Sequence, residues 1–119
     1  MIGALGSDDI ARITIANMVA CGINTNGILQ KEGVASGVAP IIVDEQGQNS
    51  IIICPGANLE LSPEDLEAQR DAITSSKVLL CQNEIPPRTT LRAMKMAKSV
   101  SSGPLVILNA APAPRLGSN

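Results

Sequence analysis

The sequence predicts an α/β fold in which a parallel sheet has helices on its faces and a separate β-hairpin is inserted. Two short apolar runs, Val78–Gln82 and Leu105–Leu108, are each preceded by a helix-like segment, an alternation that favours parallel strands. Upstream, two segments rich in β-branched residues flank a turn-forming cluster, which indicates a hairpin. The 119 residues are 45% apolar and include no Phe, Tyr or Trp, so the core is expected to be aliphatic.

The N-terminal residues predict a short strand followed by one helix. Met1–Leu5 is apolar, and Ser7 or Asp8 suits the N-cap of a helix because either side chain can accept a hydrogen bond from a free backbone N–H. Apolar residues then recur at helical spacing, and Gly22 suits the position just after a helix end. The helix is therefore expected from Asp8 to Cys21.

A hairpin is expected after a polar loop that spans Ile23–Gly33. Its strands are Val34–Val43 and Ser50–Cys54, and the cluster Asp44–Asn49 forms the turn. Pro40 lies inside the first strand and has no N–H to donate, so that side of the strand is expected to face solvent or a ligand.

A second helix start follows the hairpin. Ser62 suits the N-cap, Pro63 the first helical position, and Asp65 the return contact of a capping box, so a helix is expected from there to about Ser75.

The last elements are two strands and the helix between them. Val78–Gln82 and Leu105–Leu108 are continuous apolar runs, the pattern of strands that are buried on both faces. Thr89–Lys98 has apolar residues on one face and basic residues near its end, which favours a helix.

The composition excludes several kinds of site. Because the chain has no His, it holds no Ser-His-Asp triad, no Cys-His dyad and no histidine-ligated metal. Because it has no aromatic residue, it offers no stacking platform for single-stranded nucleic acid. The net charge of -2 argues against a surface for nucleic acid or an anionic membrane.

The three cysteines predict a reducing compartment. Cys21, Cys54 and Cys81 are odd in number and far apart, and the last two end apolar runs, where buried reduced thiols are favoured over a redox, metal or nucleophilic role. The chain shows no basic leader and no apolar run of about 20 residues, so we expect it in the cytoplasm and away from membranes.

Two polar residues follow the predicted parallel strands. Glu84 comes after Val78–Gln82 and Asn109 after Leu105–Leu108, and ligands of open α/β sheets bind beyond the carboxyl ends of the strands. Glu84 can accept hydrogen bonds from vicinal sugar hydroxyls, or it can simply cap the next helix or be solvated. The segment Gly3–Gly6 lacks the spacing of a dinucleotide-binding loop.

Four segments together form a recognisable pattern. They are Gly3 with Gly6-Ser7-Asp8-Asp9, the stretch from Ala35 to Asn58, Cys81-Gln82-Asn83-Glu84-Ile85-Pro86, and Leu108-Asn109-Ala110-Ala111-Pro112-Ala113. In this order they resemble the Gly-x-x-Gly-x-Asp segment, the lid hairpin, the Gln-Leu-Glu-x-Pro motif and the Asn-Pro-Ala-Pro-Ala motif of the ribokinase branch of the PfkB carbohydrate kinases. The resemblance extends from Met1 to about Arg115.

The resemblance implies a partial ribokinase-like, Rossmann-like parallel sheet with an inserted lid. That family transfers the γ-phosphoryl group of ATP to D-ribose with Mg²⁺ and a monovalent cation, K⁺. Glu84 falls on the family's sugar-binding glutamate, and Val38, Ala39 and Ile41 fall in the lid that closes over the sugar. The family's lids also pair between subunits, which implies a homodimer or a heterodimer through the lid.

The resemblance also implies that the chain is partial. The family's Gly-Gly-Lys-Gly-Ala-Asn run would precede Met1, and its Asn-Glu-x-x-Glu and Gly-Ala-Gly-Asp motifs would follow Arg115. Residues 34–54 are then the lid, and 1–33 and 55–119 a fragment of the core. We therefore expect no catalytic residue, no metal ligand and no ATP-binding group in this chain, and no activity from it alone. The alternative is a non-catalytic module that pairs through its lid with a full-length sugar kinase.

Overall fold

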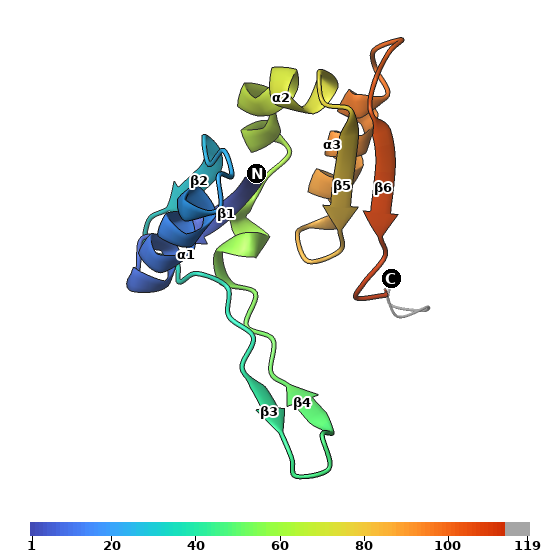
Figure 1. Ribbon diagram of the computed structural model, residues 1–119. Helices are drawn as coiled ribbons and strands as arrows, with labels where there is room; N and C mark the ends of the chain where they lie inside the picture. The colour runs from blue at the N-terminus through green and yellow to red at the C-terminus, as the bar shows by residue number, and fades with distance from the viewer. Residues whose placement is uncertain (114–119) are drawn as a thin grey trace. The chain divides into compact units, whose positions relative to one another are not determined.

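The computed structural model describes residues 1–113, so the expected end of the resemblance at Arg115 lies outside the described residues. The chain divides into two compact units, Met1–Glu60 and Leu61–Asn119. Each unit contains its own two-stranded parallel sheet, and the hairpin belongs to the first unit (Figure 1). The α/β class with parallel strands and a hairpin is confirmed.

The first unit is built on strands β1 (Ile2–Gly6) and β2 (Gly27–Lys31), which are parallel and joined through helix α1 (Asp9–Ala20). The prediction of a loop over Ile23–Gly33 was wrong, because β2 forms within it. Strand β2 is short and has no clear strand pattern in the sequence. Its stability comes from pairing along the whole of β1, which is distant in the sequence.

Helix α1 has the ends that its sequence predicts, one residue shorter on each side. The Asp8 side chain accepts a hydrogen bond from the Ala11 N–H at 2.9 Å and so forms the N-cap. At the other end Gly22 has a φ of 72° and donates its N–H to the Val19 carbonyl. Only glycine adopts that backbone conformation without strain, which is why the helix ends there.

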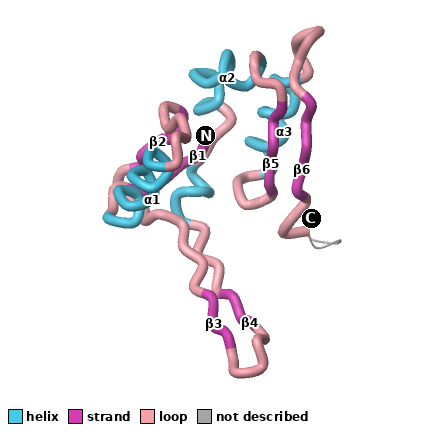
Figure 2. Tube along the Cα trace, viewed as in Figure 1, coloured by secondary structure: helices cyan, strands magenta, loops and turns pink. Residues whose placement is uncertain are grey.

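The hairpin is shorter than predicted. Its antiparallel strands are β3 (Ile41–Val43) and β4 (Asn49–Ile51), and beyond them only one isolated bridge joins Val38 to Cys54. Pro40 is the reason, because it accepts a hydrogen bond from the Ile52 N–H but has no N–H to return. Figure 2 shows the two strands at the end of an arm that extends away from β1 and β2.

The turn of the hairpin is organised by one side chain. Asp44 accepts hydrogen bonds on Oδ1 from the N–H groups of Gln46 and Gln48, at 2.9 and 2.8 Å, and Gly47 takes the positive φ that closes the turn. After the hairpin a short 3-10 helix, η1 (Gly56–Glu60), completes the first unit.

The second unit begins with the predicted capping box. The Ser62 N–H donates to Asp65 Oδ2 at 2.8 Å, and the Asp65 N–H donates to Ser62 Oγ at 3.2 Å. The single helix expected up to Ser75 is instead a 3-10 helix, η2 (Glu64–Gln69), followed by the short helix α2 (Arg70–Thr74).

Strands β5 (Val78–Gln82) and β6 (Leu105–Asn109) form the parallel sheet of the second unit, and helix α3 (Pro87–Ala97) joins them. The prediction that both strands are buried on both faces was wrong. Val78 and Leu80, with Leu105 and Ile107 opposite them, leave one face of this sheet exposed. None of the helices among residues 1–113 is long and apolar enough to cross a membrane.

The core of the second unit lies between its helices and the other face of the sheet. Its most deeply buried apolar side chains are Leu61, Leu66, Ile73, Met96 and Ala97. The expected burial of the thiols that end apolar runs is wrong for Cys54, which is exposed, and Cys81 is half-buried; Cys21, for which no burial was predicted, is also exposed. Burial raises the pKa of the Cys81 thiol, so it stays protonated.

Candidate functional site

The carboxyl ends of β5 and β6 bring the two predicted polar residues to one edge of a sheet. Gln82 and Asn109 form the last pair of the parallel ladder, so Asn109 is the end of β6 and does not follow it. Glu84 comes two residues after the end of β5. The edge therefore carries one carboxylate and two amides, groups that together accept and donate hydrogen bonds to a polar ligand.

The Glu84 carboxylate is exposed, and none of the residues from 1 to 113 gives it a hydrogen bond or an ion pair. It does not cap the next helix, whose first turn is closed by the Pro86 carbonyl accepting from the Thr89 N–H at 2.8 Å. This overturns the capping alternative. A carboxylate that makes no such bond within the described residues is free to accept hydrogen bonds from a ligand.

The loop that carries Glu84 is held at its start by two neighbouring segments. The Asn83 N–H donates to the Ala111 carbonyl at 3.1 Å and its side-chain amide to the Pro112 carbonyl at 3.4 Å. The Thr90 hydroxyl donates to the Gln82 carbonyl at 3.3 Å. The segment after β6 and the first turn of α3 thus both hold the start of the loop, next to Glu84.

The lid residues named from the sequence lie on two faces of the hairpin. The bridge of Val38 with Cys54 and the pairing of Ile41 with Ile51 belong to one continuous register. Since alternate residues of a strand point to opposite faces, Ala39 and Ile41 share a face and Val38 lies on the other. All of them are exposed, Ile41 by 60%.

The sequence analysis did not predict that Ser36 hydrogen-bonds to Asp8 at the base of the hairpin, which is called the root below. Ser36 donates its N–H to Asp8 Oδ2 and its hydroxyl to Asp8 Oδ1, both at 2.7 Å. These bonds, led by that from the Ser36 N–H, hold the pKa of the Asp8 carboxyl below its ordinary value. The sequence offered one indication of this contact, a small polar residue between an Ala and a Gly.

Two features of the described residues concern the metal and phosphate groups that the resemblance implies. Among residues 1–113 no group of three or more Asp, Glu, Cys or His side chains could hold a metal ion. The Gly6 amide donates to Ser36 Oγ at 3.0 Å, and a Cβ at Gly6 would lie 2.2 Å from the Val34 carbonyl oxygen. That glycine therefore serves backbone packing and does not offer its N–H to a phosphate.

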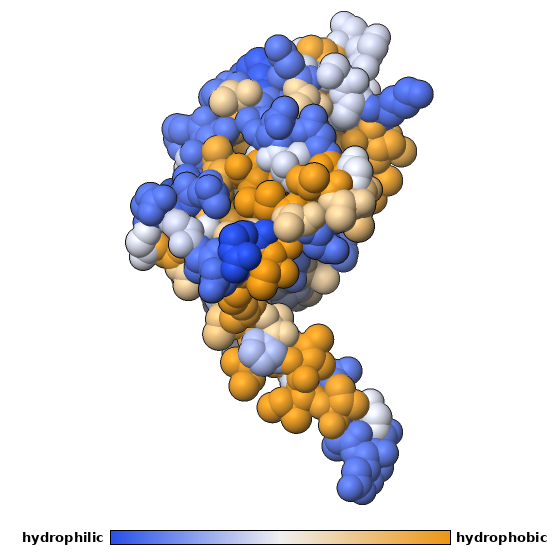
Figure 3. Space-filling model, turned by 60° about the vertical axis from the view of Figure 1, so that its left-hand side comes forward, coloured by the Kyte–Doolittle hydropathy of each residue, from blue (hydrophilic) through white to orange (hydrophobic). Residues whose placement is uncertain are grey.

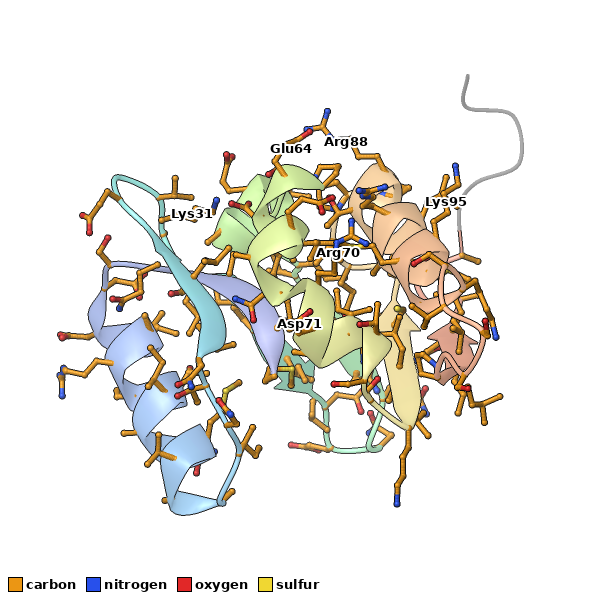
Figure 4. All side chains as sticks on the ribbon, turned by 90° about the horizontal axis from the view of Figure 1, so that it is seen from above. Lys31, Glu64, Arg70, Asp71, Arg88 and Lys95 are labelled. Carbon is orange, nitrogen blue, oxygen red and sulfur yellow. The ribbon has the colours of Figure 1, made fainter. Side chains whose placement is uncertain are left out.

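Charged side chains over the helices of the second unit are of mixed sign. Figure 4 shows Glu64, Arg70, Asp71, Arg88 and Lys95 there. Glu67 pairs with Arg92 and, at 2.7 Å, with Arg70, and both hydrogen bonds lower the pKa of its carboxyl, that from Arg92 most. The mixture favours ion pairing within the surface over an anion site.

The pfkB family carbohydrate kinase profile matches residues 1–116. The chain belongs to the pfkB family. It is similar to the ribokinase of Mus musculus, with 40% identity over 109 residues that make up 92% of this chain and 33% of that protein. The resemblance to the ribokinase branch is thereby confirmed.

Two solved structures of this family have the same fold over nearly the whole chain. The ribokinase of Thermotoga maritima superposes with a TM-score of 0.78 at 39% identity, covering 99% of this chain and 36% of that one. The Arabidopsis thaliana ribokinase complexed with ribose and ATP gives a TM-score of 0.70 at 31% identity, covering 90% and 35%. The chain therefore spans about a third of the length of these relatives.

Proposed function

We propose that this chain is the sugar-holding and lid part of a ribokinase-type kinase, which transfers the γ-phosphoryl group of ATP to the 5-hydroxyl of D-ribose. One observation carries the proposal: in a chain of the pfkB family, Glu84 is exposed and unpaired among residues 1–113, at the sheet edge that also holds Asn109. A carboxylate there accepts hydrogen bonds from two vicinal sugar hydroxyls, and the amide both donates and accepts.

Titration of the ¹⁵N-labelled chain with D-ribose tests the sugar site. We expect shifts centred on the amides of Glu84, Gln82 and Asn109, and we expect Glu84→Gln to weaken binding roughly tenfold because a charge-assisted hydrogen bond is lost. Glu32→Gln is the control, since it removes an exposed carboxylate of the first unit. Equal weakening by both substitutions, or shifts spread evenly over the chain, would refute a site at Glu84.

The lid part of the proposal concerns the hairpin at 34–54. Its face with Ala39 and Ile41 offers aliphatic groups that would exclude water from a bound sugar, and exclusion of water strengthens hydrogen bonds within a site and protects ATP from hydrolysis. Val38 lies on the opposite face and we assign it to the other side of the lid. Ribose-dependent protection of the Ile41 amide from solvent exchange is the expected result.

The chain on its own is expected to be inactive. In the proposal ATP, Mg²⁺ and a monovalent cation are held by other motifs of the family. In support, no group of three or more Asp, Glu, Cys or His side chains among residues 1–113 could hold a metal ion. A coupled assay with D-ribose and ATP should show no turnover above a no-protein blank. Turnover by the purified chain would refute this part of the proposal.

A second function is favoured by the hairpin surface: a non-catalytic module that pairs with a full-length sugar kinase. Figure 3 shows hydrophobic side chains along the arm and a hydrophilic tip. The exposed aliphatic residues are Ile41, Ile42, Val43, Ile51, Ile52 and Ile53. Such a patch marks a surface for association, either with a second copy or with the lid of a longer kinase.

Size-exclusion chromatography of the chain mixed with a ribokinase distinguishes these outcomes. Co-elution that Ile42→Asp abolishes would support the module, and a concentration-dependent dimer of the chain alone would support a homodimer. Two independent monomer peaks would contradict both.

For the compartment we propose the cytoplasm, because Cys21, Cys54 and Cys81 are free thiols.

A further inference from the structure

The root of the hairpin is tied to the corner between β1 and α1. Both carboxylate oxygens of Asp8 accept hydrogen bonds from Ser36, one from its N–H and one from its hydroxyl. The same Ser36 Oγ accepts from the Gly6 N–H, and Ser36 is only 3% exposed. Three segments, the end of β1, the cap of α1 and the start of the hairpin, therefore meet in one closed network of hydrogen bonds.

Backbone packing reinforces this junction. A Cβ on Gly56 would lie 2.4 Å from the Ala35 carbonyl oxygen, and the Ala57 N–H donates to that same oxygen at 2.9 Å. Together with the close approach at Gly6, these contacts pack the backbone at both ends of the hairpin tightly against each other and against β1.

The arm is weakest a few residues farther out. Val38 and Cys54 exchange two hydrogen bonds, but at the next pair of this register the Pro40 carbonyl accepts from the Ile52 N–H and no bond returns. The side chains of Pro40 and Ile52 are exposed, so packing does not replace the missing hydrogen bond. Regular pairing resumes only at β3 and β4.

We propose that Asp8 and Ser36 form a latch that fixes the root of the hairpin, and that the arm bends at Pro40 and Ile52. Asp8 and Ser36 are thus positioning residues, which decide which part of the arm moves. The interpretation of the arm as a lid rests on the proposed function. A fixed root lets the outer arm, residues 41–51, swing without disturbing β1 and α1.

Asp8→Asn separates the latch from the helix cap. Asn caps a helix as well as Asp does, so α1 is expected to remain intact. Asn has one acceptor oxygen in place of two, and its NH₂ group would face a donor of Ser36, so the latch loses at least one bond. Asp9→Asn is the matched control, because Asp9 is the neighbouring carboxylate and pairs only with Arg12 among the described residues.

Hydrogen exchange in the 119-residue chain gives the first readout. The Ser36 amide should exchange roughly tenfold faster in Asp8→Asn than in the wild type, since a hydrogen bond to a charged acceptor is lost. The Cys21 amide at the end of α1 should keep its rate, and Asp9→Asn should change neither. An unchanged Ser36 rate, or equal acceleration at Cys21, would overturn the latch.

Spin-label distances give the second readout. With the three cysteines replaced by Ser, labels at Asn17→Cys and Ala35→Cys report the root, and labels at Asn17→Cys and Gln46→Cys report the tip. Ser36→Ala should broaden both distance distributions, whereas Pro40→Ala, which restores an N–H for the Ile52 carbonyl, should narrow the tip distribution alone. A root distribution unaffected by Ser36→Ala would refute the latch, and a tip unaffected by Pro40→Ala would refute the bend.

Two features keep these tests independent. Should Asp8→Asn fail to fold, Ser36→Ala still decides, because it leaves Asp8 free to accept from the Ala11 N–H. Neither readout requires ribose or nucleotide, so absence of sugar binding would refute the proposed function and leave the latch standing.

Discussion

At the scale of single residues, Asp8 shows how one carboxylate can serve two elements. It caps α1 and accepts both hydrogen bonds from Ser36. Because these bonds lower its pKa in the folded chain, the ionised form stabilises folding above the unfolded-state pKa, and that contribution is lost as the pH falls through the folded-state value.

We expect the difference in free energy of unfolding between the wild type and Asp8→Asn to be largest near neutral pH. It should shrink once the pH falls below roughly 4, the pKa of an unperturbed Asp. Urea unfolding at pH 7 and pH 3 measures it, and Asp9→Asn controls for the loss of a charge. A difference that stays constant with pH would mean that the Asp8 carboxylate is not stabilised in its ionised form by folding.

Two glycines of β1 give a matched prediction. Gly6→Ala places a Cβ 2.2 Å from the Val34 carbonyl oxygen, whereas Gly3→Ala meets only Ile28 Cδ1, at an ordinary 3.7 Å. Gly6→Ala should therefore lower the free energy of unfolding by at least about 1–3 kcal/mol, the usual cost of overpacking, and Gly3→Ala by much less. Equal urea midpoints for the two variants would show that the root relaxes freely.

At the scale of elements, a buried side-chain hydrogen bond joins α3 to the segment before η2. Thr89 is fully buried and its hydroxyl donates to the Leu61 carbonyl at 2.7 Å. Thr89→Val keeps the shape of the side chain but leaves that carbonyl without its partner. We expect a loss of about 1–3 kcal/mol in the free energy of unfolding.

Thr74→Val is the control for this prediction, because among residues 1–113 the Thr74 hydroxyl bonds only within its own helix, to the Arg70 carbonyl. Thermal and urea unfolding should place Thr89→Val well below Thr74→Val in stability. The reverse order would mean that α3 is held by its apolar face alone.

At the scale of the whole chain, exposed aliphatic surface dominates the expected behaviour in solution. One face of the β5–β6 sheet is exposed, with Leu80 open by 65% and its ladder partner Ile107 by 44%. Surfaces of this kind promote association. We expect the isolated chain to self-associate and to be poorly soluble.

Replacing this pair by charges tests the expectation. Leu80→Lys with Ile107→Glu should reduce concentration-dependent association in sedimentation velocity and leave the urea midpoint nearly unchanged, since opposite charges face each other across the ladder. Leu79→Lys, on the less exposed face, is the control and should unfold the second unit. Unchanged association in the double variant would indicate that the chain associates through the hairpin and not through this sheet.

The sequence predicted local features well, because local chemistry determines them. The capping box of Ser62 and Asp65, the N-cap at Asp8 and the glycine after α1 each depend on residues within a few positions. Elements that depend on distant partners were predicted less well. Strand β2 was missed because its stability comes from β1, and the strands of the hairpin were predicted too long because the cost of Pro40 depends on its partner in the ladder.

The sequence by itself determined the family, the α/β class and the position of Glu84 after an apolar strand, since these follow from residue order. Only the tertiary structure decided that Glu84 is unpaired among the described residues, that Val38 and Ile41 lie on opposite faces of the hairpin, and that Ser36 binds Asp8. The physical reason is that hydrogen-bond partners and strand register join residues that are far apart in the chain, and no local pattern records them.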